Sequence, residues 1–243
     1  MLNIVIPMAG RGSRFEDAGY TFPKPLIDIN GKTMIEIVVN NLRPKTDYRF
    51  IFICQKEHYE KYDLYNILKN ATNNKFEIIQ INGVTEGAAC TALTASQYIN
   101  NEDSLLIANS DQYIETDINE FISDAKKKDV DGLIMTFKAS HPKWSYARTD
   151  SDGKVIEVAE KKVISNDATV GLYYFKRGKD YVESAQNMIE KDIRFNNEFY
   201  VCPVFNEMIL LNKNTYTHVI PADKMHGLGT PQDLELFLQK QLC

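Results

Sequence analysis

The sequence contains no hydrophobic run long enough to cross a membrane and no excess of positive charge. Its longest apolar stretches, such as residues 105–108, fall far short of the roughly 20 residues that a membrane helix requires. The chain carries 28 lysines and arginines against 33 aspartates and glutamates, a net charge of −5. General attraction to nucleic acid or to an anionic membrane is therefore not expected, and any site for anionic ligands must be built locally.

Cysteine is scarce as well, and its spacing does not match the usual zinc patterns. Cys54, Cys90, Cys202 and Cys243 are scattered, with no Cys-x-x-Cys pair. This favours free thiols over disulfides or a zinc site. The chain begins directly with a strand-like run and shows no basic and apolar leader typical of a signal peptide. These features predict a cytoplasmic protein without nucleic-acid or membrane partners.

Strand-like and helix-like stretches alternate through the first half of the chain. Apolar runs predict strands at residues 2–6, 50–54, 76–81 and 104–108. Between them, apolar residues at helical spacing predict helices at residues 33–42, 57–68 and 91–99. Repeated β-α-β units predict an α/β fold of three layers, in which helices cover both faces of a mostly parallel, Rossmann-like mixed sheet.

The pattern changes from about residue 130. Short strands separated by turns are expected at residues 133–138, 147–149, 155–158 and 170–175. Because no linker rich in Pro, Gly or Ser intervenes, we expect an antiparallel extension rather than a second domain. Helical stretches are expected at residues 181–191, 204–212 and 231–240. The 243 residues are therefore expected to form one domain.

A loop of small and basic residues follows the first predicted strand directly. It runs through Met8, Ala9, Gly10, Arg11, Gly12, Ser13 and Arg14. Glycines let backbone N–H groups turn toward a ligand, and successive N–H groups form an anion-binding concavity. Arg14 and Lys24 add full charges, and Lys24 lies between two prolines. A Gly-x-Gly alone fits a plain tight turn equally well, but the two cations favour a polyphosphate site.

A second candidate site follows the predicted buried strand at residues 104–108, in Asn109, Ser110 and Asp111. Ligands of open parallel sheets bind at the carboxyl ends of the strands. An aspartate there can hold Mg²⁺ beside the phosphates of the opening loop. The alternative is an aspartate that caps a helix or stabilises a turn.

Small residues also separate the strand at residues 76–81 from the helix that follows. Gly87 and Ala88, after Glu86, let the backbone approach and read a flat base, and the side-chain amide of Gln80 can add a hydrogen bond. The alternative is that the glycine and alanine simply start a helix. This motif is weak by itself.

Later motifs suggest a second ligand. Glu160 and Lys161 follow a predicted hairpin, and Gly171 lies inside a predicted strand, which often marks a close approach of backbone to ligand. A charged strand end at the surface is the alternative. Residues 144–146 and 196–200 are expected to line the same site, although Trp144 and Tyr200 fit a core role equally well.

Taken in order, these motifs resemble the sugar-nucleotidyltransferase family of nucleotide-diphospho-sugar pyrophosphorylases. The resemblance covers nearly the whole chain and rests on Gly10, Gly12, Ser13, Arg14, Pro23, Lys24, Asp111, Glu160, Lys161, residues 170–173 and residues 229–231. It implies an enzyme that moves a nucleotidyl group from a nucleoside triphosphate to the phosphate of an acceptor, with Mg²⁺ as cofactor and release of pyrophosphate. Residues 1–130 would form the nucleotide half and residues 131–243 the acceptor half.

The resemblance also implies roles for single residues. Arg14 would hold the β- and γ-phosphates, Lys24 would lie between the α-phosphate and the incoming phosphate, and Lys161 would hold the acceptor phosphate. With Asp111 these form the implied catalytic set. The implied nucleotide-binding residues are Met8, Ala9, Gly10, Arg11, Gly12, Ser13, Gln80, Glu86, Gly87, Ala88, Asn109 and Ser110. The implied acceptor-binding residues are Glu160, Gly171, Glu198 and Tyr200.

One position departs from the family pattern. Gly227 stands where the family has an aspartate that binds the metal, two residues before Gly229. Either Asp223 reaches the metal from the preceding turn, or Asp111 holds Mg²⁺ with phosphates and water, which magnesium tolerates.

The resemblance is greatest to cytidylyltransferases of capsule and surface-polysaccharide precursor synthesis, which implies CTP and, as acceptor, L-glutamine phosphate. A sugar 1-phosphate is the alternative acceptor. A glycosyltransferase, the other enzyme class with a similar core, would be expected to have a metal-binding Asp-x-Asp motif after the fourth strand. The chain has Asp111 followed by Gln112 and Tyr113 and therefore lacks the second aspartate. A nucleotide-binding module without catalysis is supported only by Gly227. Assembly stays open, with a homodimer as one option.

Overall fold

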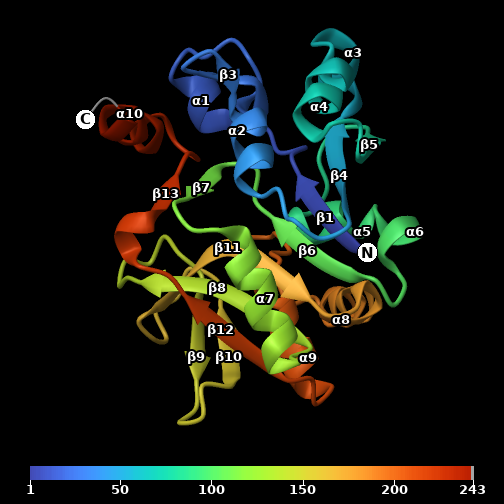
Figure 1. Ribbon diagram of the computed structural model, residues 1–243, viewed down its shortest axis with the longest axis vertical. Helices are drawn as coiled ribbons and strands as arrows, with labels where there is room; N and C mark the ends of the chain where they lie inside the picture. Colours follow the sequence, from blue (N-terminus) through green and yellow to red (C-terminus); the bar gives the residue numbers. More distant parts are fainter. Residues whose placement is uncertain (242–243) are drawn as a thin grey trace.

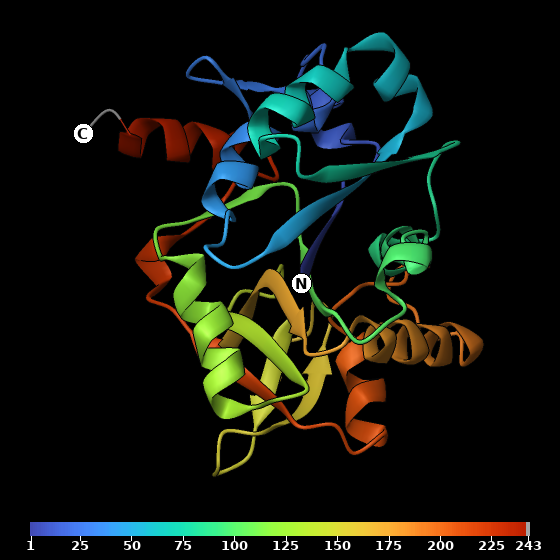
Figure 2. The same ribbon diagram turned by 45° about the vertical axis from the view of Figure 1, so that its right-hand side comes forward.

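The computed structural model describes residues 1–241 and contains one main sheet with helices on both sides (Figure 1 and Figure 2). The strands of this sheet are β1 (Leu2–Pro7), β4 (Tyr48–Gln55), β5 (Phe76–Ile81), β6 (Ser104–Ala108), β8 (Gly132–Lys138), β9 (Tyr146–Thr149), β10 (Val155–Ala159), β11 (Asp167–Phe175) and β12 (Thr215–Val219). Two small ribbons lie outside it: β2 (Asp28–Ile29) with β3 (Lys32–Thr33), and β7 (Gln112–Ile114) with β13 (Met225–Gly227).

The sheet is parallel in its first half and mixed in its second. Its main path runs β10-β9-β11-β6-β1-β4-β5, and β8 pairs with both β11 and β12. β1 pairs in parallel with β4 and β6, and β4 pairs in parallel with β5. β11 is antiparallel to β6, β8 and β9. The predicted α/β fold, with a mostly parallel core and an antiparallel extension, is confirmed.

The helices divide between the two faces because the strands bury alternate side chains on opposite sides. The helices and single helical turns are α1 (Ser13–Asp17), η1 (Lys24–Leu26), α2 (Met34–Asn41), α3 (Lys56–Lys61), α4 (Leu64–Thr72), α5 (Ala88–Leu93), α6 (Ser96–Ile99), α7 (Ile118–Lys128), α8 (Gly178–Glu190), α9 (Val204–Leu210), η2 (Ala222–Lys224) and α10 (Pro231–Gln241). One core includes buried residues of α2, α4 and α7, and the other includes those of α5, α6, α8 and α9.

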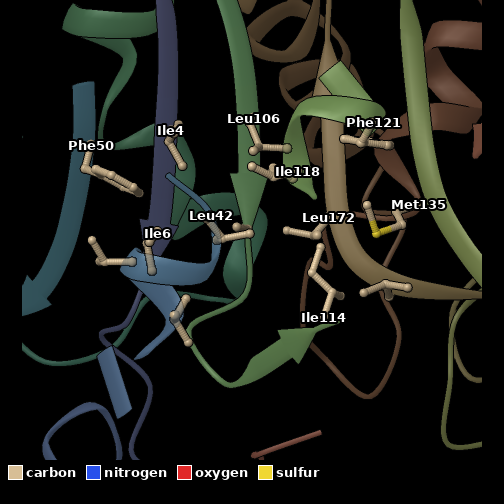
Figure 3. Close-up of a cluster of buried hydrophobic side chains, with 14 of the residues drawn as sticks. Ile4, Ile6, Leu42, Phe50, Leu106, Ile114, Ile118, Phe121, Met135 and Leu172 are labelled. Atoms are coloured by element: carbon tan, nitrogen blue, oxygen red, sulfur yellow. The ribbon is translucent and has the colours of Figure 1, made fainter. Parts of the chain in front are cut away.

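The alternation is visible within single strands. Ile4 and Ile6 of β1 belong to the α2/α7 core, whereas Val5 between them belongs to the opposite core. Figure 3 shows the first core, where side chains of β1, β4, β6 and β11 meet Leu42, which follows α2, and Ile118 at the start of α7. Each of these side chains is at least nine-tenths buried. Burial on both faces explains why these strands appear in the sequence as continuous apolar runs.

The two ends of the chain meet in a third, smaller core. Phe15 of α1, Ile29 of β2 and Met34 of α2 cluster with Leu234 and Phe237 of α10. In Figure 1, α10 lies beside α1 and α2, although it closes the chain. This contact brings the loop after β13 against the segment that follows the glycine loop.

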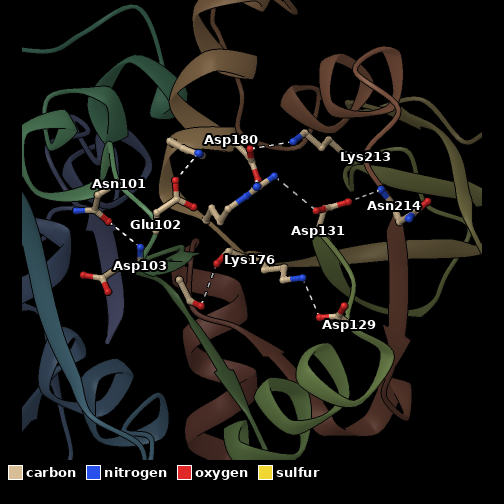
Figure 4. A network of polar contacts seen from close by, with 12 residues as sticks. Asn101, Glu102, Asp103, Asp129, Asp131, Lys176, Asp180, Lys213 and Asn214 are labelled. Carbon is tan, nitrogen blue, oxygen red and sulfur yellow. Dashed lines mark hydrogen bonds and ion pairs between the residues drawn. The ribbon is translucent and has the colours of Figure 1, made fainter.

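Charged residues form a network at the edge where β6 and β8 begin (Figure 4). Asp180, only 2% exposed, accepts from Arg177 at 2.8 Å and from Lys213 at 3.1 Å. Asn214 donates its backbone N–H to Asp131 at 2.9 Å. Because β6 begins here and ends before Asp111, the network stabilises the edge of the sheet opposite to that aspartate.

Several local expectations differ from the structure. The helix expected at residues 57–68 is split into α3 and α4, because Asp63 adopts a left-handed conformation with φ +47°. The helix expected at residues 91–99 is split into α5 and α6 around Ala95. Helix α7 and strand β12 were not predicted, although Asp117 caps α7 and Ile118, Phe121 and Ile122 form its buried stripe.

The remaining expectations concern thiols and membranes. Cys54 and Cys202 are buried and Cys90 is half-buried, all three as free thiols. Cys243 lies outside the described residues. Within residues 1–241, no helix combines the length and the apolar character that a membrane crossing requires.

Candidate functional site

The glycine loop leaves β1 at the carboxyl edge of the sheet and is held there by the neighbouring strand. Met8 donates its N–H to the carbonyl of Ile53 at 2.9 Å, and the Gln55 side chain donates to the carbonyl of Ala9 at 2.9 Å. Gly12 adopts φ +70°, which a residue with a side chain rarely does, and it turns the chain into α1. The loop therefore has a fixed path around an open space.

That space, here called the loop cavity, has a volume of about 490 Å³. It is lined by Pro7, Met8, Ala9, Gly10, Arg11, Gly12, Ser13, Lys24, Pro25, Val84, Thr85, Gly87, Ala88, Thr91, Ser110 and Glu198. Backbone groups and two cationic side chains dominate one wall, which suits an anionic ligand. Small residues around Gly87 and Ala88 form the other wall.

A second space, here called the Gly171 cavity, has a volume of about 410 Å³. Its lining is Arg14, Ala88, Asn109, Asp111, Gln112, Lys143, Trp144, Ser145, Glu160, Thr169, Val170, Gly171, Tyr173, Tyr200, Val201, Cys202, Met225, Gly227, Gly229, Thr230, Gln232 and Asp233. The carboxyl end of β6, the middle of β11 and the segment before α10 thus contribute to one site. Cations, carboxylates and aromatic rings are all present.

An ion pair joins the two cavities. Nζ of Lys24, in the loop cavity, lies 2.7 Å from Oδ2 of Asp111, in the Gly171 cavity. Both side chains are a little over one-fifth exposed, so they are shielded but accessible to a ligand. Charge-assisted contacts of this length are stronger than neutral hydrogen bonds. Lys24 and Asp111 therefore lie at the border between the two cavities.

The family to which the chain belongs follows from comparison with known proteins. A model of the family described as "Nucleotidyl transferase" matches residues 4–234. The chain belongs to the nucleotidyl transferase family. The structure of the nucleoside-diphosphate-sugar pyrophosphorylase from Vibrio cholerae RC9 superposes with a TM-score of 0.83, at 27% identity, covering 97% of this chain and 99% of that chain. The inositol-1-phosphate CTP transferase from T. maritima shares the fold, with a TM-score of 0.74 over 98% of this chain and 95% of that chain, at 15% identity.

Curated relatives of this nucleotidyl transferase are longer proteins. The bifunctional protein GlmU of Methanococcus aeolicus is 25% identical over 178 residues, which cover 72% of this chain and 40% of the relative. GlmU of Buchnera aphidicola is 23% identical over 258 residues, which cover 99% of this chain and 52% of the relative. The chain thus spans about half or less of the length of these relatives.

The segment before α10 packs directly against Asp111. Leu228 donates its N–H to the Asp111 carbonyl at 2.8 Å, and a Cβ on Gly229 would lie 2.8 Å from Asp111 Oδ2. Glycine at 229 therefore leaves room for the carboxylate. A Cβ on Gly227 would lie 3.7 Å from Oδ2 of Asp233, so Asp233 presents its carboxylate next to the position where a residue-227 side chain would begin.

The structure does not bring Asp223 to Asp111. In the β7–β13 ladder, Gly227 faces Gln112 and Met225 faces Ile114, so the antiparallel register carries Asp223 away from Asp111. Asp223 is exposed in η2 and lines neither cavity. We therefore do not retain Asp223 as a metal ligand. Among residues 1–241, no group of three or more His, Cys, Asp or Glu could hold a metal by itself.

The loop at residues 192–200 contacts the start of α5. Phe199 donates its N–H to the Glu86 carbonyl at 2.7 Å, and its carbonyl accepts from Ala89 at 3.0 Å. Gly87 has φ +130°, and a Cβ there would lie 2.4 Å from the Phe199 carbonyl oxygen. Glycine at 87 is thus required both by its conformation and by the close backbone contact.

The charged residues of that loop make contacts at the protein surface. The Glu86 carboxylate accepts from Arg194 at 2.6 Å, and the Arg194 guanidinium lies 4.0 Å from the centre of the Phe199 ring. Glu86 is two-thirds exposed and lines neither cavity. Gln80 is also exposed on β5 and lines neither cavity. The structure gives Glu86 a structural contact and leaves Gln80 away from the site.

A half-buried carboxylate, that of Glu160, lines the Gly171 cavity. The Glu160 carboxylate accepts a hydrogen bond from Ser145, and burial raises the pKa of Glu160 above its usual value, while Lys161 opposes the shift. Burial also raises the pKa of Tyr173 and that of Cys202. Glu160 therefore ionises less readily than an exposed glutamate.

Lys161 lies beside this cavity rather than in its wall. Its Nζ donates to the Tyr200 hydroxyl at 3.0 Å and lies 5.5 Å from the centre of the Phe195 ring. Its backbone is left-handed, with φ +49°, a strained conformation that often occurs at functional sites. Burial is the main reason why the pKa of Tyr200 is raised.

The cavities divide the remaining predicted residues differently from the expectation. Arg14 and Asn109, expected at the nucleotide, line the Gly171 cavity. Glu198, expected at the acceptor, lines the loop cavity. Trp144 and Tyr200 line the Gly171 cavity as expected. The predicted residues that share the loop cavity are Met8, Ala9, Gly10, Arg11, Gly12, Ser13, Lys24, Gly87, Ala88 and Ser110.

Several residues of the Gly171 cavity were not singled out from the sequence for this site, among them Gln112, Lys143 and Asp233. Gln112 directly follows Asp111, but nothing local shows which way its side chain points. Lys143 and Asp233 are 90 residues apart in sequence and form an ion pair of 3.7 Å in the cavity wall. The only sequence signal for any of the three is the spacing from Thr230 to Asp233, which is typical of a helix cap. The Thr230 hydroxyl does donate to Asp233 at 2.7 Å.

Proposed function

We propose that this chain is an enzyme that transfers a nucleotidyl group from a nucleoside triphosphate to the phosphate of a small acceptor. The triphosphate would occupy the loop cavity and the acceptor the Gly171 cavity. An acceptor phosphate oxygen forms a new bond to the α-phosphorus, the bond from that phosphorus to the β-phosphate oxygen breaks, and pyrophosphate leaves. No general base is needed, because the attacking oxygen is already ionised.

The observation that carries this proposal is the contact of Lys24 with Asp111 at the border of the two cavities, at 2.7 Å. Transfer between two anions requires them to be held in line while their charge is neutralised. Lys24 would stand between the α-phosphate and the incoming phosphate, as the resemblance implies. Arg14 and Lys143, on the other side of the border, can hold the remaining phosphate charge.

Mg²⁺ fits this arrangement if the substrates complete its coordination. Magnesium takes one or two carboxylates together with phosphate oxygens and waters. Asp111 and Asp233 line the same cavity as Gly227, and both lie next to the segment that contains it. When bound, the metal would neutralise charge on the phosphates, and Asp111 with Asp233 would hold it.

For the substrates we propose CTP and a phosphorylated acceptor such as L-glutamine phosphate, as the sequence resemblance implies, for capsule or surface-polysaccharide precursors. The similarity to the Vibrio cholerae pyrophosphorylase favours a second candidate, transfer to a sugar 1-phosphate. The mixed charge of the Gly171 cavity accommodates either acceptor. We further propose that the chain acts in the cytoplasm as a single domain, with homodimer formation to be checked by light scattering.

The test is pyrophosphate release by the purified chain. CTP, UTP, dTTP, GTP and ATP are each combined with L-glutamine phosphate, glucose 1-phosphate and inositol 1-phosphate. Pyrophosphate that appears only when both substrates are present supports transfer. Triphosphate binding without turnover for every pair would contradict the proposal and indicate a nucleotide-binding module.

A further inference from the structure

The floor of the Gly171 cavity contains a side-chain amide without a partner. Gln112 is 8% exposed and lines the cavity, and its Nε2 has no hydrogen-bond partner within the described residues. Buried polar groups in folded proteins are nearly always hydrogen-bonded, because an unpaired donor loses its hydration without compensation. An unpaired donor in a cavity wall indicates a position that a ligand completes.

A second amide points to the same place. If Gly171 carried a Cβ, that atom would lie 2.1 Å from Gln112 Nε2 and 2.4 Å from Asn109 Nδ2. The two amide nitrogens therefore converge on the bare face of Gly171. The structure describes no hydrogen bond between the two amides. Both side chains also line the cavity, so an oxygen of a ligand there could accept a hydrogen bond from either amide nitrogen.

The backbone of β11 lets both amides pack directly against it. Gly171 has φ +91°, and the register of β11 against β8 shifts between Thr169 and Tyr173. Asn109 donates its N–H to the Gly171 carbonyl at 3.1 Å, which fixes the end of β6 against this irregularity. A Cβ at residue 171 would collide with both amides. Glycine here therefore allows Gln112 and Asn109 to keep their positions in the cavity wall.

The surrounding charge indicates what kind of oxygen enters. The cavity is lined by three carboxylates, Asp111, Glu160 and Asp233, and by two cations, Arg14 and Lys143. Arg14 and Lys143 are needed for the phosphate, so an anionic oxygen placed beside the amides would have no cation to pair with. Neutral amide donors suit a neutral oxygen, either a hydroxyl or a carbonyl.

We propose that Gln112 and Asn109 recognise a neutral oxygen on the part of the acceptor that lies beyond its phosphate, and so determine acceptor specificity. This inference rests on the proposed function, since it assigns the acceptor to the Gly171 cavity. A sugar hydroxyl and the side-chain amide oxygen of L-glutamine phosphate share this chemistry. The acceptor panel distinguishes the two sources.

The test is the kinetics of Gln112→Glu, which keeps the shape but replaces the donor by an acceptor. The acceptor used is whichever member of the panel gives turnover with the parent chain. We expect the acceptor KM to rise about tenfold, the loss of one hydrogen bond, while the KM of the triphosphate stays within twofold. Gln112→Met removes the donor without adding charge and gives the same direction of change if Gln112→Glu folds poorly.

The matched control is Gln186→Glu, which makes the same chemical change in an exposed residue of α8 that lines neither cavity and should leave the acceptor KM unchanged. Methyl phosphate, which retains the phosphate but lacks the further oxygen, should inhibit the parent chain and Gln112→Glu with the same inhibition constant. A merely structural role for Gln112 would weaken methyl phosphate as well.

The outcomes separate the two proposals. Turnover by the parent chain with an acceptor KM unchanged in both Gln112 variants would overturn this inference and leave the proposed function standing. A higher melting temperature of Gln112→Glu with an unchanged KM would show that residues 109 and 112 bond each other instead. No turnover with any substrate pair would overturn the proposed function and, with it, this inference.

Discussion

Lys24 and Asp111, 87 residues apart in the chain, form an ion pair of 2.7 Å at the border of two cavities. One partner belongs to the turn η1 after the glycine loop, and the other follows β6. The parallel pairing of β1 with β6 brings these two segments to the same edge of the sheet. The sheet topology thereby places a cation and a carboxylate where a nucleoside triphosphate and its acceptor would meet.

Removing either partner should reduce turnover without unfolding the protein. We expect Lys24→Ala and Asp111→Ala each to lower kcat by roughly 10²–10³, the scale of losing one preorganised charge contact. Lys176→Ala is the control, because Lys176 makes an ion pair of the same kind with Asp129 at the surface, 2.8 Å long. Steady-state kinetics measure the loss of turnover, and thermal melts check that the variants remain folded. Activity of Lys24→Ala or Asp111→Ala within a few-fold of the parent would refute the assignment.

Gly87→Ala should destabilise the protein strongly. The substitution combines a positive φ with a contact of 2.4 Å to Phe199, and the two effects together should cost about 2–4 kcal/mol. Gly153→Ala separates them, because Gly153 has φ +80° but no atom within 4 Å of the added Cβ, and should cost only about 1 kcal/mol. Urea unfolding gives both values. Equal losses would show that the Phe199 contact is unimportant.

Glu160→Gln should raise stability at neutral pH while impairing acceptor binding. The pKa of Glu160 is raised by burial, so the stability that its protonated form contributes is complete below the unfolded pKa and is lost as the pH rises through the folded pKa. The neutral variant should match the parent in acid and melt at a higher temperature at pH 7.

Melting curves between pH 4 and pH 8, together with the acceptor KM, test this expectation. Glu157→Gln is the control, since it removes a charge from strand β10 just before Glu160, at a side chain that pairs with Arg148 and is more than one-third exposed. A gain of the same size in Glu157→Gln, or a gain in Glu160→Gln that does not depend on pH, would exclude burial as the cause.

Removing divalent metal with EDTA should abolish pyrophosphate release, and Mg²⁺ should restore it. Asp233→Asn should raise the Mg²⁺ concentration for half-maximal activity by about tenfold, because one of the two carboxylates proposed to hold the metal is lost. Asp223→Asn should leave the titration unchanged, because the β7–β13 register carries Asp223 away from Asp111. If Asp223→Asn shifts the titration and Asp233→Asn does not, the choice of Asp233 is wrong.

The parts of the fold that follow from local signals were predicted from the sequence. The roles of the β1 apolar run and of Gly12 after it can be predicted from a dozen residues, because burial on both faces requires apolar residues and the positive φ of Gly12 favours glycine. Asp111 was identified because it directly follows a buried strand. The parallel core and the site at its carboxyl edge could therefore be predicted.

The residues that the sequence missed depend on long-range packing. Asp233 reaches the site only because α10 packs on α1 and α2 through the small core that contains Leu234 and Phe237. Gln112 faces Gly171 only because β11 is irregular there. Asp223 was a plausible ligand by sequence distance alone, and the register of β13 excludes it. No local sequence pattern predicts the register of a strand or the packing of α10 against the start of the chain.

The most direct test of the central claim is transfer of label from a nucleoside triphosphate labelled at its α-phosphorus, CTP first, in the presence of the phosphorylated acceptor. The account predicts that the label appears in a product containing the acceptor, with one pyrophosphate released per product, and that Lys24→Ala loses both signals together. Release of labelled nucleoside monophosphate or diphosphate with no label in any acceptor would contradict it, because that result means hydrolysis rather than transfer.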